Sequence, residues 1–242
     1  LDRAGSRPTQ ALPPAIEAVA ALPEELVDLA VDAGEIFLAN ATSRSLQRLR
    51  PGGRPELVAT FAQPPTVLHL TPSAVFVGSH DGHVYALDLG LGCARWVFKA
   101  GAEVRTAVVP YEAKGGPNVR VRPPRVFFGD VLGRLYSLDA QTGKLEWSLK
   151  VDEHPNATLT GSGTFHEGVI YQPVSSLEVT SAADPKYECC KFRGAVAAVD
   201  AWSGELRWKA FTIPQEPKVV ATTKAGTKVY APSGAPVWNS PT

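Results

Sequence analysis

Two adjacent cysteines, Cys189 and Cys190, are the residues of this 242-residue chain best suited to chemistry. Three states are open to them. They could be buried free thiols, since reduced cysteine is a common small core residue; one could bond to Cys93; or they could bond to each other. Adjacent Cα atoms lie only about 3.8 Å apart across a trans peptide, so a disulfide between neighbours makes a strained ring. Strain of this kind occurs where function requires it.

The elements that must position the pair are copies of one strand–turn–strand unit. The pattern Gly-x-x-x-Gly-x-x-Tyr-(Ala/Ser)-Leu-Asp of Gly78–Asp88 recurs with the same spacing at Gly129–Asp139, and a shorter copy stands at Gly194–Asp200. Each copy then continues to a glycine and a tryptophan, which are Gly92 and Trp96, Gly143 and Trp147, and Gly204 and Trp208.

The spacing has a physical explanation. An Asp at the end of a strand bonds the backbone of the turn that follows it, and Gly four residues later takes the positive φ that closes the hairpin. The Trp on the outer strand can bury its ring against the neighbouring unit while its N–H finds a backbone acceptor. Repeats of this length, with four strands each, predict an all-β fold of the β-propeller class.

The predicted propeller is incomplete. We expect about four blades of a larger ring, at residues 26–62, 65–100, 104–150 and 157–212, with a further blade starting at 236–242. The unit at 26–62 lacks the Trp and is assigned from its strand pattern alone. Residues 1–25 are expected to be a linker or a short helix between prolines.

Two long loops are expected on one face of the propeller. An insertion, Val174–Phe192, separates the second and third strands of the last Trp-bearing unit and contains the cysteine pair. The crossing to the next blade, Ile213–Pro236, is also long. In a four-stranded antiparallel blade these two connections lie at the same end, and loops on a rigid scaffold are where sites are built. Cys93 occupies a hairpin turn at the opposite end, so geometry argues against a bond to it.

The repeat Ser137–Trp147 resembles the tryptophan-docking repeat of quinoprotein dehydrogenase propellers, and the resemblance covers about residues 70–242. The segment Cys189–Gly194 resembles the Cys-Cys and Arg-Gly pattern of quinoprotein alcohol dehydrogenases, with a shorter gap. It most resembles the polyvinyl-alcohol dehydrogenase branch, in which the cysteine pair leads directly into a docking repeat. The first copy departs from the pattern, with Leu91 where Thr is usual.

This resemblance implies an enzyme that uses pyrroloquinoline quinone (PQQ) to oxidise a small or polymeric alcohol to a carbonyl, with a cytochrome c as a possible electron acceptor. Cys189 and Cys190 would form a disulfide ring lying flat against the quinone. Arg193 would pair with a carboxylate of the cofactor, a task that suits its planar guanidinium. The alternative for Arg193 is a side chain flanking a strand with its charge in solvent.

A second match implies further cofactor contacts. Ser233-Gly234-Ala235 resembles the Ser-Gly-Ala-Glu segment near the quinone, in which the Glu binds calcium. Pro236 replaces that Glu here, so calcium remains possible only without a ligand from this position. Gly234 and Ala235 are therefore candidate cofactor-binding residues. Trp238, at the start of an expected inner strand, is either a wall of the pocket or a core residue.

No residue is assigned as the catalytic base. The family uses an Asp, but Asp130 and Asp184 match no motif, and the hairpin Asp residues stand at the wrong end of the blades. The base and the remaining blades are expected beyond Thr242, so the chain is expected to be an inactive fragment. His80 and His83 have spacing that can bind metal, but an Asp-Gly turn explains it without one.

Composition excludes several other functions. The chain has 24 basic and 24 acidic residues and a net charge of zero, which speaks against a nucleic-acid partner. No apolar run approaches the roughly 20 residues that span a bilayer. A disulfide between neighbours favours a periplasmic or extracellular location. The alternative function is a non-catalytic propeller that binds protein partners on its loop-rich face, since an outer-membrane assembly scaffold of bacteria uses a similar repeat.

Overall fold

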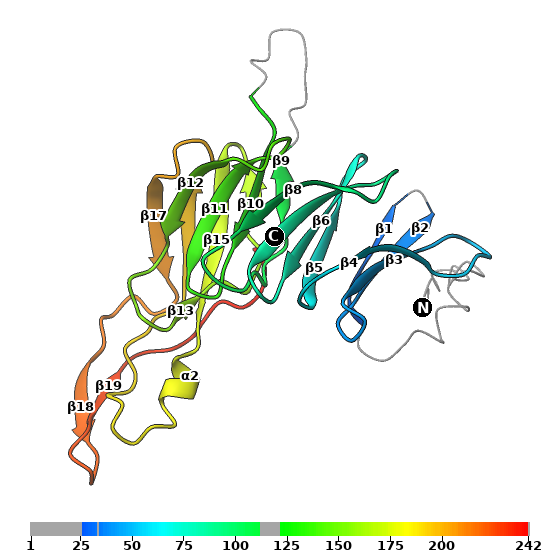
Figure 1. The fold of residues 1–242 in the computed structure, drawn as a ribbon. Helices are drawn as coiled ribbons and strands as arrows, with labels where there is room; N and C mark the ends of the chain where they lie inside the picture. The colour runs from blue at the N-terminus through cyan, green and yellow to red at the C-terminus, as the bar shows by residue number, and fades with distance from the viewer. Residues whose placement is uncertain (1–25, 33, 112–121, 242) are drawn as a thin grey trace, which may run out of the picture.

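The computed structural model describes residues 26–32, 34–111 and 122–241. These residues form four antiparallel sheets that stand side by side in chain order as blades of a propeller (Figure 1). The described residues also include a two-stranded hairpin and a single-turn helix, α2 (Glu178–Ser181). The predicted all-β propeller with tryptophan-docking repeats is confirmed. The linker or helix predicted at residues 1–25 lies outside the described residues.

Each blade runs from an inner to an outer strand. The first two blades consist of β1 (Leu26–Asp32), β2 (Glu35–Asn40), β3 (Ser45–Leu49) and β4 (Glu56–Thr60), then β5 (Pro65–Leu70), β6 (Ala74–Ser79), β7 (His83–Asp88) and β8 (Ala94–Lys99). The third consists of β9 (Val109–Tyr111), β10 (Arg125–Gly129), β11 (Arg134–Asp139) and β12 (Leu145–Lys150). In the fourth, β15 (Val169–Ser176), β16 (Ala195–Asp200) and β17 (Leu206–Phe211) follow two short inner strands, β13 (Ala157–Thr158) and β14 (Thr164–His166), which both pair with β15.

The hairpin that repeats in the sequence has the predicted geometry. The Oδ1 atom of Asp139 accepts hydrogen bonds from the backbone N–H groups of Gln141 and Thr142, at 3.0 and 2.8 Å. Gly143 then has a φ of 71°, a left-handed conformation that favours glycine. Asp88 and Asp200 bond their own turns in the same way. The Asp side chain and the glycine therefore close each turn locally.

Tryptophan joins the second blade to the third and the third blade to the fourth. Trp96 donates its Nε1–H to the carbonyl oxygen of Ala140 at 2.9 Å, and Trp147 bonds Ala201 at 3.1 Å. A Cβ added at Gly143 would lie 2.7 Å from the ring of Trp96, so this glycine also makes room for the docking side chain. Because the apolar faces of adjacent blades meet at these contacts, a buried hydrophobic cluster lies between each pair of sheets.

The two ends of the arc lack this contact. In the first blade Val58 takes the place of the tryptophan and packs against Gly92. In the fourth blade Trp208 contacts Tyr171, but it is 47% exposed and donates no hydrogen bond within the described residues. The docking is therefore present between the second and third blades and between the third and fourth.

The last part of the chain differs from the prediction. The crossing from the fourth blade contains a hairpin that the sequence did not predict, β18 (Lys218–Thr222) and β19 (Lys228–Ala231). The further blade expected to start at 236–242 stays a prediction, and residues 237–241 form no strand within the described part of the chain. They run past β15, where Val237 N donates to the carbonyl oxygen of Val174 at 3.2 Å.

No helix in the described part of the chain is long and apolar enough to cross a membrane.

We expect replacement of Trp96 by Phe to lower the free energy of unfolding by about 1–2 kcal/mol, because the variant leaves the Ala140 carbonyl without its donor. Trp208→Phe is the matched control and should cost less than about 0.5 kcal/mol, because the same atoms are removed from an undocked ring. Urea unfolding followed by circular dichroism measures both. Equal losses would show that the docking bond contributes no stability.

Candidate functional site

Cys189 and Cys190 are bonded to each other, so the third of the predicted states is the one observed. The peptide between them is cis and their Cα atoms are 3.0 Å apart. Cys93 is free and exposed in its hairpin turn. The pair follows α2 within the insertion, at the end of the fourth blade where the chain also crosses onward into β18 (Figure 1).

Hydrogen bonds join the insertion to the β18–β19 hairpin. Tyr230 of β19 donates its backbone N–H to the Cys189 carbonyl oxygen at 2.8 Å and its hydroxyl to Glu188 at 3.0 Å. Thr227 donates its hydroxyl to the Pro185 carbonyl oxygen at 2.7 Å. The two long loops predicted to share a face therefore brace one another. A bond from Lys191, then one from Tyr230, lowers the pKa of Glu188.

The disulfide forms part of the wall of a cavity of about 280 Å³ between these two loops. Both cysteines line it, and so does Ser233, the first residue of the predicted Ser-Gly-Ala segment. The other lining residues belong to the insertion and the hairpin: Ala182, Asp184, Pro185, Tyr187, Thr223, Lys228, Val229 and Tyr230. The cavity is thus built by the parts of the chain that depart from the regular blade.

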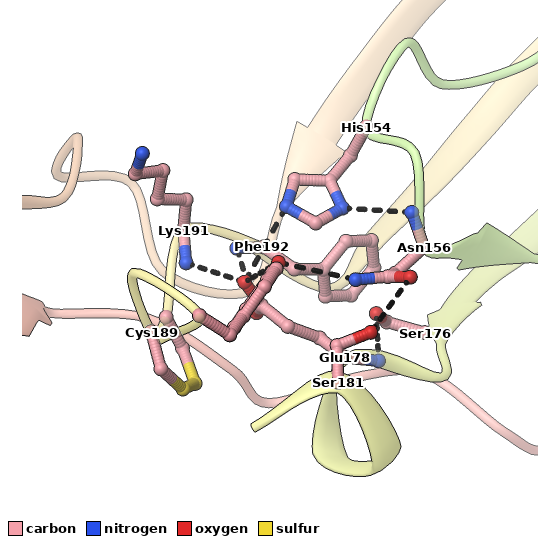
Figure 2. Close-up of a disulfide and its surroundings, with 10 residues drawn as sticks. His154, Asn156, Ser176, Glu178, Ser181, Cys189, Lys191 and Phe192 are labelled. Carbon is pink, nitrogen blue, oxygen red and sulfur yellow. Dashed lines mark hydrogen bonds and ion pairs between the residues drawn. A yellow bond between two sulfur atoms is a disulfide. The ribbon is translucent and has the colours of Figure 1, made fainter. Parts of the chain in front are cut away.

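A buried carboxylate holds the segment that follows the disulfide. Glu178 at the start of α2 is 4% exposed. Its oxygens accept the backbone N–H groups of Lys191 at 2.8 Å and of Phe192 at 3.0 Å, as Figure 2 shows. The hydroxyl of Tyr187 donates to the same carboxylate at 3.0 Å. One side chain therefore contacts the insertion both before and after the cysteine pair.

Two further residues support this carboxylate. His154 Nε2 lies 3.5 Å from Glu178 Oε1, while His154 Nδ1 accepts the backbone N–H of Asn156 at 3.2 Å (Figure 2). Asn156 donates its side-chain amide to the Tyr187 hydroxyl at 3.1 Å. Burial, then the hydrogen bond to Glu178 and its charge, raises the pKa of Tyr187. The network links the insertion to the connection between the third and fourth blades.

Arg193 faces away from this cavity in the structure. Its guanidinium lies over the ring of Phe211 at 4.0 Å and donates to the carbonyl oxygens of Ile213 and Pro214 at 3.5 and 3.0 Å. It also lies 3.9 Å from the exposed carboxylate of Glu216. Arg193 is not among the described residues that line the cavity. The structure therefore separates it from the cysteine pair with which the sequence grouped it.

Gly234 and Ala235 lie beside the strand that follows the disulfide. Gly234 donates its N–H to Phe192 O at 2.7 Å and accepts that of Gly194 at 2.8 Å. A Cβ added at Gly194 would overlap the carbonyl oxygen of Ala235, so only glycine permits this approach. These backbone contacts hold Ser233 at the cavity. Trp238 is 45% exposed, and its carbonyl group approaches Gly161.

The lining of the cavity carries few charges. It holds one ammonium group, Lys228, and one carboxylate, Asp184, beside the uncharged disulfide. A ligand with several carboxylates could pair one of them with Lys228 and would need cations from other parts of the protein for the rest. The described residues contain no group of three or more His, Cys, Asp or Glu side chains that could hold a metal ion. His80 and His83 pair separately, with Glu103 and Asp81.

Sequence reasoning missed the residues that build the site around the disulfide, above all Glu178, Tyr187 and Tyr230. Glu178 carries no local signal, since its partners Lys191 and Phe192 stand 13 and 14 positions further on. Tyr230 stands in a crossing that was expected to be a loop. The one available signal was the aromatic and charged content of both loops.

Docked antiparallel blades define a β-propeller with tryptophan-docking repeats. Residues 63–241 match the family described as outer membrane protein assembly factor BamB, and the chain belongs to this family.

The curated relatives include dehydrogenases. The chain is 39% identical over 168 residues to a polyvinylalcohol dehydrogenase of Pseudomonas sp., and 40% identical over 168 residues to one of Sphingopyxis sp.. The matches cover 69% of this chain and 26% and 25% of the relatives. A quinohemoprotein alcohol dehydrogenase of Pseudomonas putida, ADH-IIG, is 28% identical over 138 residues, 56% of this chain and 18% of that protein. The chain thus spans about a quarter of the length of the first two relatives.

Substitution of Gly194 by Ala should destabilise the protein by about 1–3 kcal/mol, because the added methyl group must displace the backbone at Ala235. Gly90→Ala is the matched control, since a Cβ there meets only Asp88 Oδ1 at 3.4 Å; it should cost less than about 0.5 kcal/mol. Urea unfolding compares the two variants. A neutral Gly194→Ala would mean that the contact of residues 233–236 with the fourth blade does not persist in solution.

Proposed function

We propose that this chain is part of a PQQ-dependent dehydrogenase that oxidises an alcohol to a carbonyl, and that it contributes the disulfide side of the cofactor site. The observation that carries the proposal is the Cys189–Cys190 disulfide on the wall of a cavity at the loop end of the fourth blade. Relatives named as polyvinylalcohol dehydrogenases support an alcohol, small or polymeric, as the substrate. The activity belongs to the whole protein, of which these residues would supply one part.

In this proposal PQQ supplies the two-electron oxidation chemistry, and the residues of this chain bind and orient it. The cysteine ring would lie against the cofactor, and Lys228 would pair with one of its carboxylates. Ser233, which also lines the cavity, is held there by the backbone contacts of Gly234 and Ala235. Arg193 joins the site only if its guanidinium leaves the carbonyl oxygens of Ile213 and Pro214.

The remaining parts of the proposal rest on chemistry and on relatives. Trp238 is a candidate for the pocket wall, and calcium would need ligands other than Pro236. A disulfide persists in oxidising compartments, which supports a periplasmic or extracellular location. The relative named as a quinohemoprotein supports a haem protein such as a cytochrome c as electron acceptor.

A second candidate function is a non-catalytic scaffold that binds protein partners. The specific observation in its favour is the description of the matched family, an outer membrane assembly factor. In that case the insertion and the β18–β19 hairpin would form the partner surface. Binding of PQQ discriminates between the two functions.

We expect this chain to bind PQQ saturably in equilibrium dialysis with calcium present. Replacing Cys189 and Cys190 by Ala should weaken binding about tenfold, because the variant lacks the disulfide ring that would lie under the cofactor. Cys93→Ala is the control and should bind as the unaltered chain does, since Cys93 is exposed in a turn at the other end of a blade. Alcohol-dependent reduction of a dye by the chain alone is not expected.

Absence of saturable uptake would contradict the dehydrogenase proposal and favour the scaffold. Uptake that is unchanged in the double cysteine variant would leave PQQ as a ligand but remove the disulfide from its site.

A further inference from the structure

A single carboxylate connects the two sides of the disulfide. Within the insertion, Glu178 accepts the Tyr187 hydroxyl before the cysteine pair and the N–H groups of Lys191 and Phe192 after it. All the contacts made to its two oxygens come from donors. Hydrogen bonds to a charged acceptor are short and roughly twice as strong as neutral ones, so this set fixes the segment firmly.

The carboxylate is itself anchored to the fourth blade. The backbone N–H of Glu178 bonds Ser176 Oγ at 2.9 Å, and that of Leu177 bonds the Asn156 carbonyl oxygen at 2.9 Å. Ser176 is the last residue of β15 and pairs with Ala157 of β13. Glu178 thus lies two residues after the end of β15, at the point where the insertion leaves the sheet.

His154 lies against the same carboxylate. His154 faces Oε1 at 3.5 Å and packs edge-on against Phe192, with 5.5 Å between ring centroids. His154 Nδ1 accepts the N–H of Asn156, so Nε2 is the ring nitrogen that faces Glu178. The carboxylate is therefore enclosed by donors on each side.

We propose that Glu178 is the positioning residue of the disulfide: its carboxylate holds Tyr187 and the Lys191–Phe192 backbone together, and so sets the orientation of the Cys189–Cys190 ring toward the cavity. The use of that orientation rests on the proposed function, in which the ring packs against a quinone. The positioning itself can be measured on the disulfide without any cofactor.

The test uses the full chain with Cys93→Ser, so that Cys189 and Cys190 are its two remaining cysteines. Dithiothreitol supplies two electrons and becomes a cyclic disulfide, while the two cysteines gain two protons and become thiols; labelling of the new thiols gives the rate. Glu178→Gln keeps the size of the side chain but turns an NH₂ group toward a backbone N–H. We expect reduction to be about tenfold faster, because the segment that carries the disulfide is held less firmly and exposes the bond to dithiothreitol more often.

Glu153→Gln is the matched control, since Glu153 is exposed one residue before His154. It should be reduced at the rate of the parent. Thermal unfolding of each variant separates positioning from general stability. A Glu178→Gln variant that melts earlier but is reduced at the parent rate, measured well below its melting temperature, would overturn the proposal.

Tyr187→Phe covers the case in which Glu178→Gln does not fold. It removes one donor to the carboxylate and keeps the ring, so we expect a smaller acceleration, about two- to fivefold. Reduction at the parent rate in this variant would also count against the proposal. Faster reduction in a protein that takes up no PQQ would retain Glu178 as the positioning residue and reject the dehydrogenase function.

Discussion

The fold depends on the contact by which the outer strand of one blade docks on the hairpin of the next. Each blade has an apolar face that must be buried, and the tryptophan ring with its single N–H gives that burial a defined register. Gly143 serves this contact twice, because its φ of 71° closes the turn and its missing Cβ admits the ring of Trp96. A side chain at this position would disturb both the hairpin and the blade interface.

Docking at one end of the blades leaves the other end free to vary. The turns that receive the tryptophans are tightly bonded and short, so an insertion there would separate neighbouring blades. The connections at the opposite end meet no such requirement. The fourth blade uses this freedom for the insertion and the β18–β19 hairpin, which stabilise each other through Tyr230 and Cys189. The cavity lies between these two irregular segments, and neither segment could form it alone.

The repeated part of the fold was predictable because its causes are local. Asp139 bonds a turn two and three residues away, so the sequence spacing itself records the geometry. The site was less predictable because its causes are distant in sequence. Glu178 matters through residues 13 and 14 positions later. The cysteine pair was recognisable from residue type alone.

The charges around the disulfide indicate what this wall can contribute to a ligand. Lys191 is engaged by Glu188 and by the ring of Tyr230, and Arg193 by Phe211 and two carbonyl oxygens. The lining of the cavity is left with one ammonium group and one carboxylate. A polyanionic ligand would therefore have to draw its attraction from cations elsewhere. The disulfide wall contributes shape, and a surface that acts through shape depends on being held at a fixed angle, which is the role that the buried carboxylate of Glu178 is placed to perform.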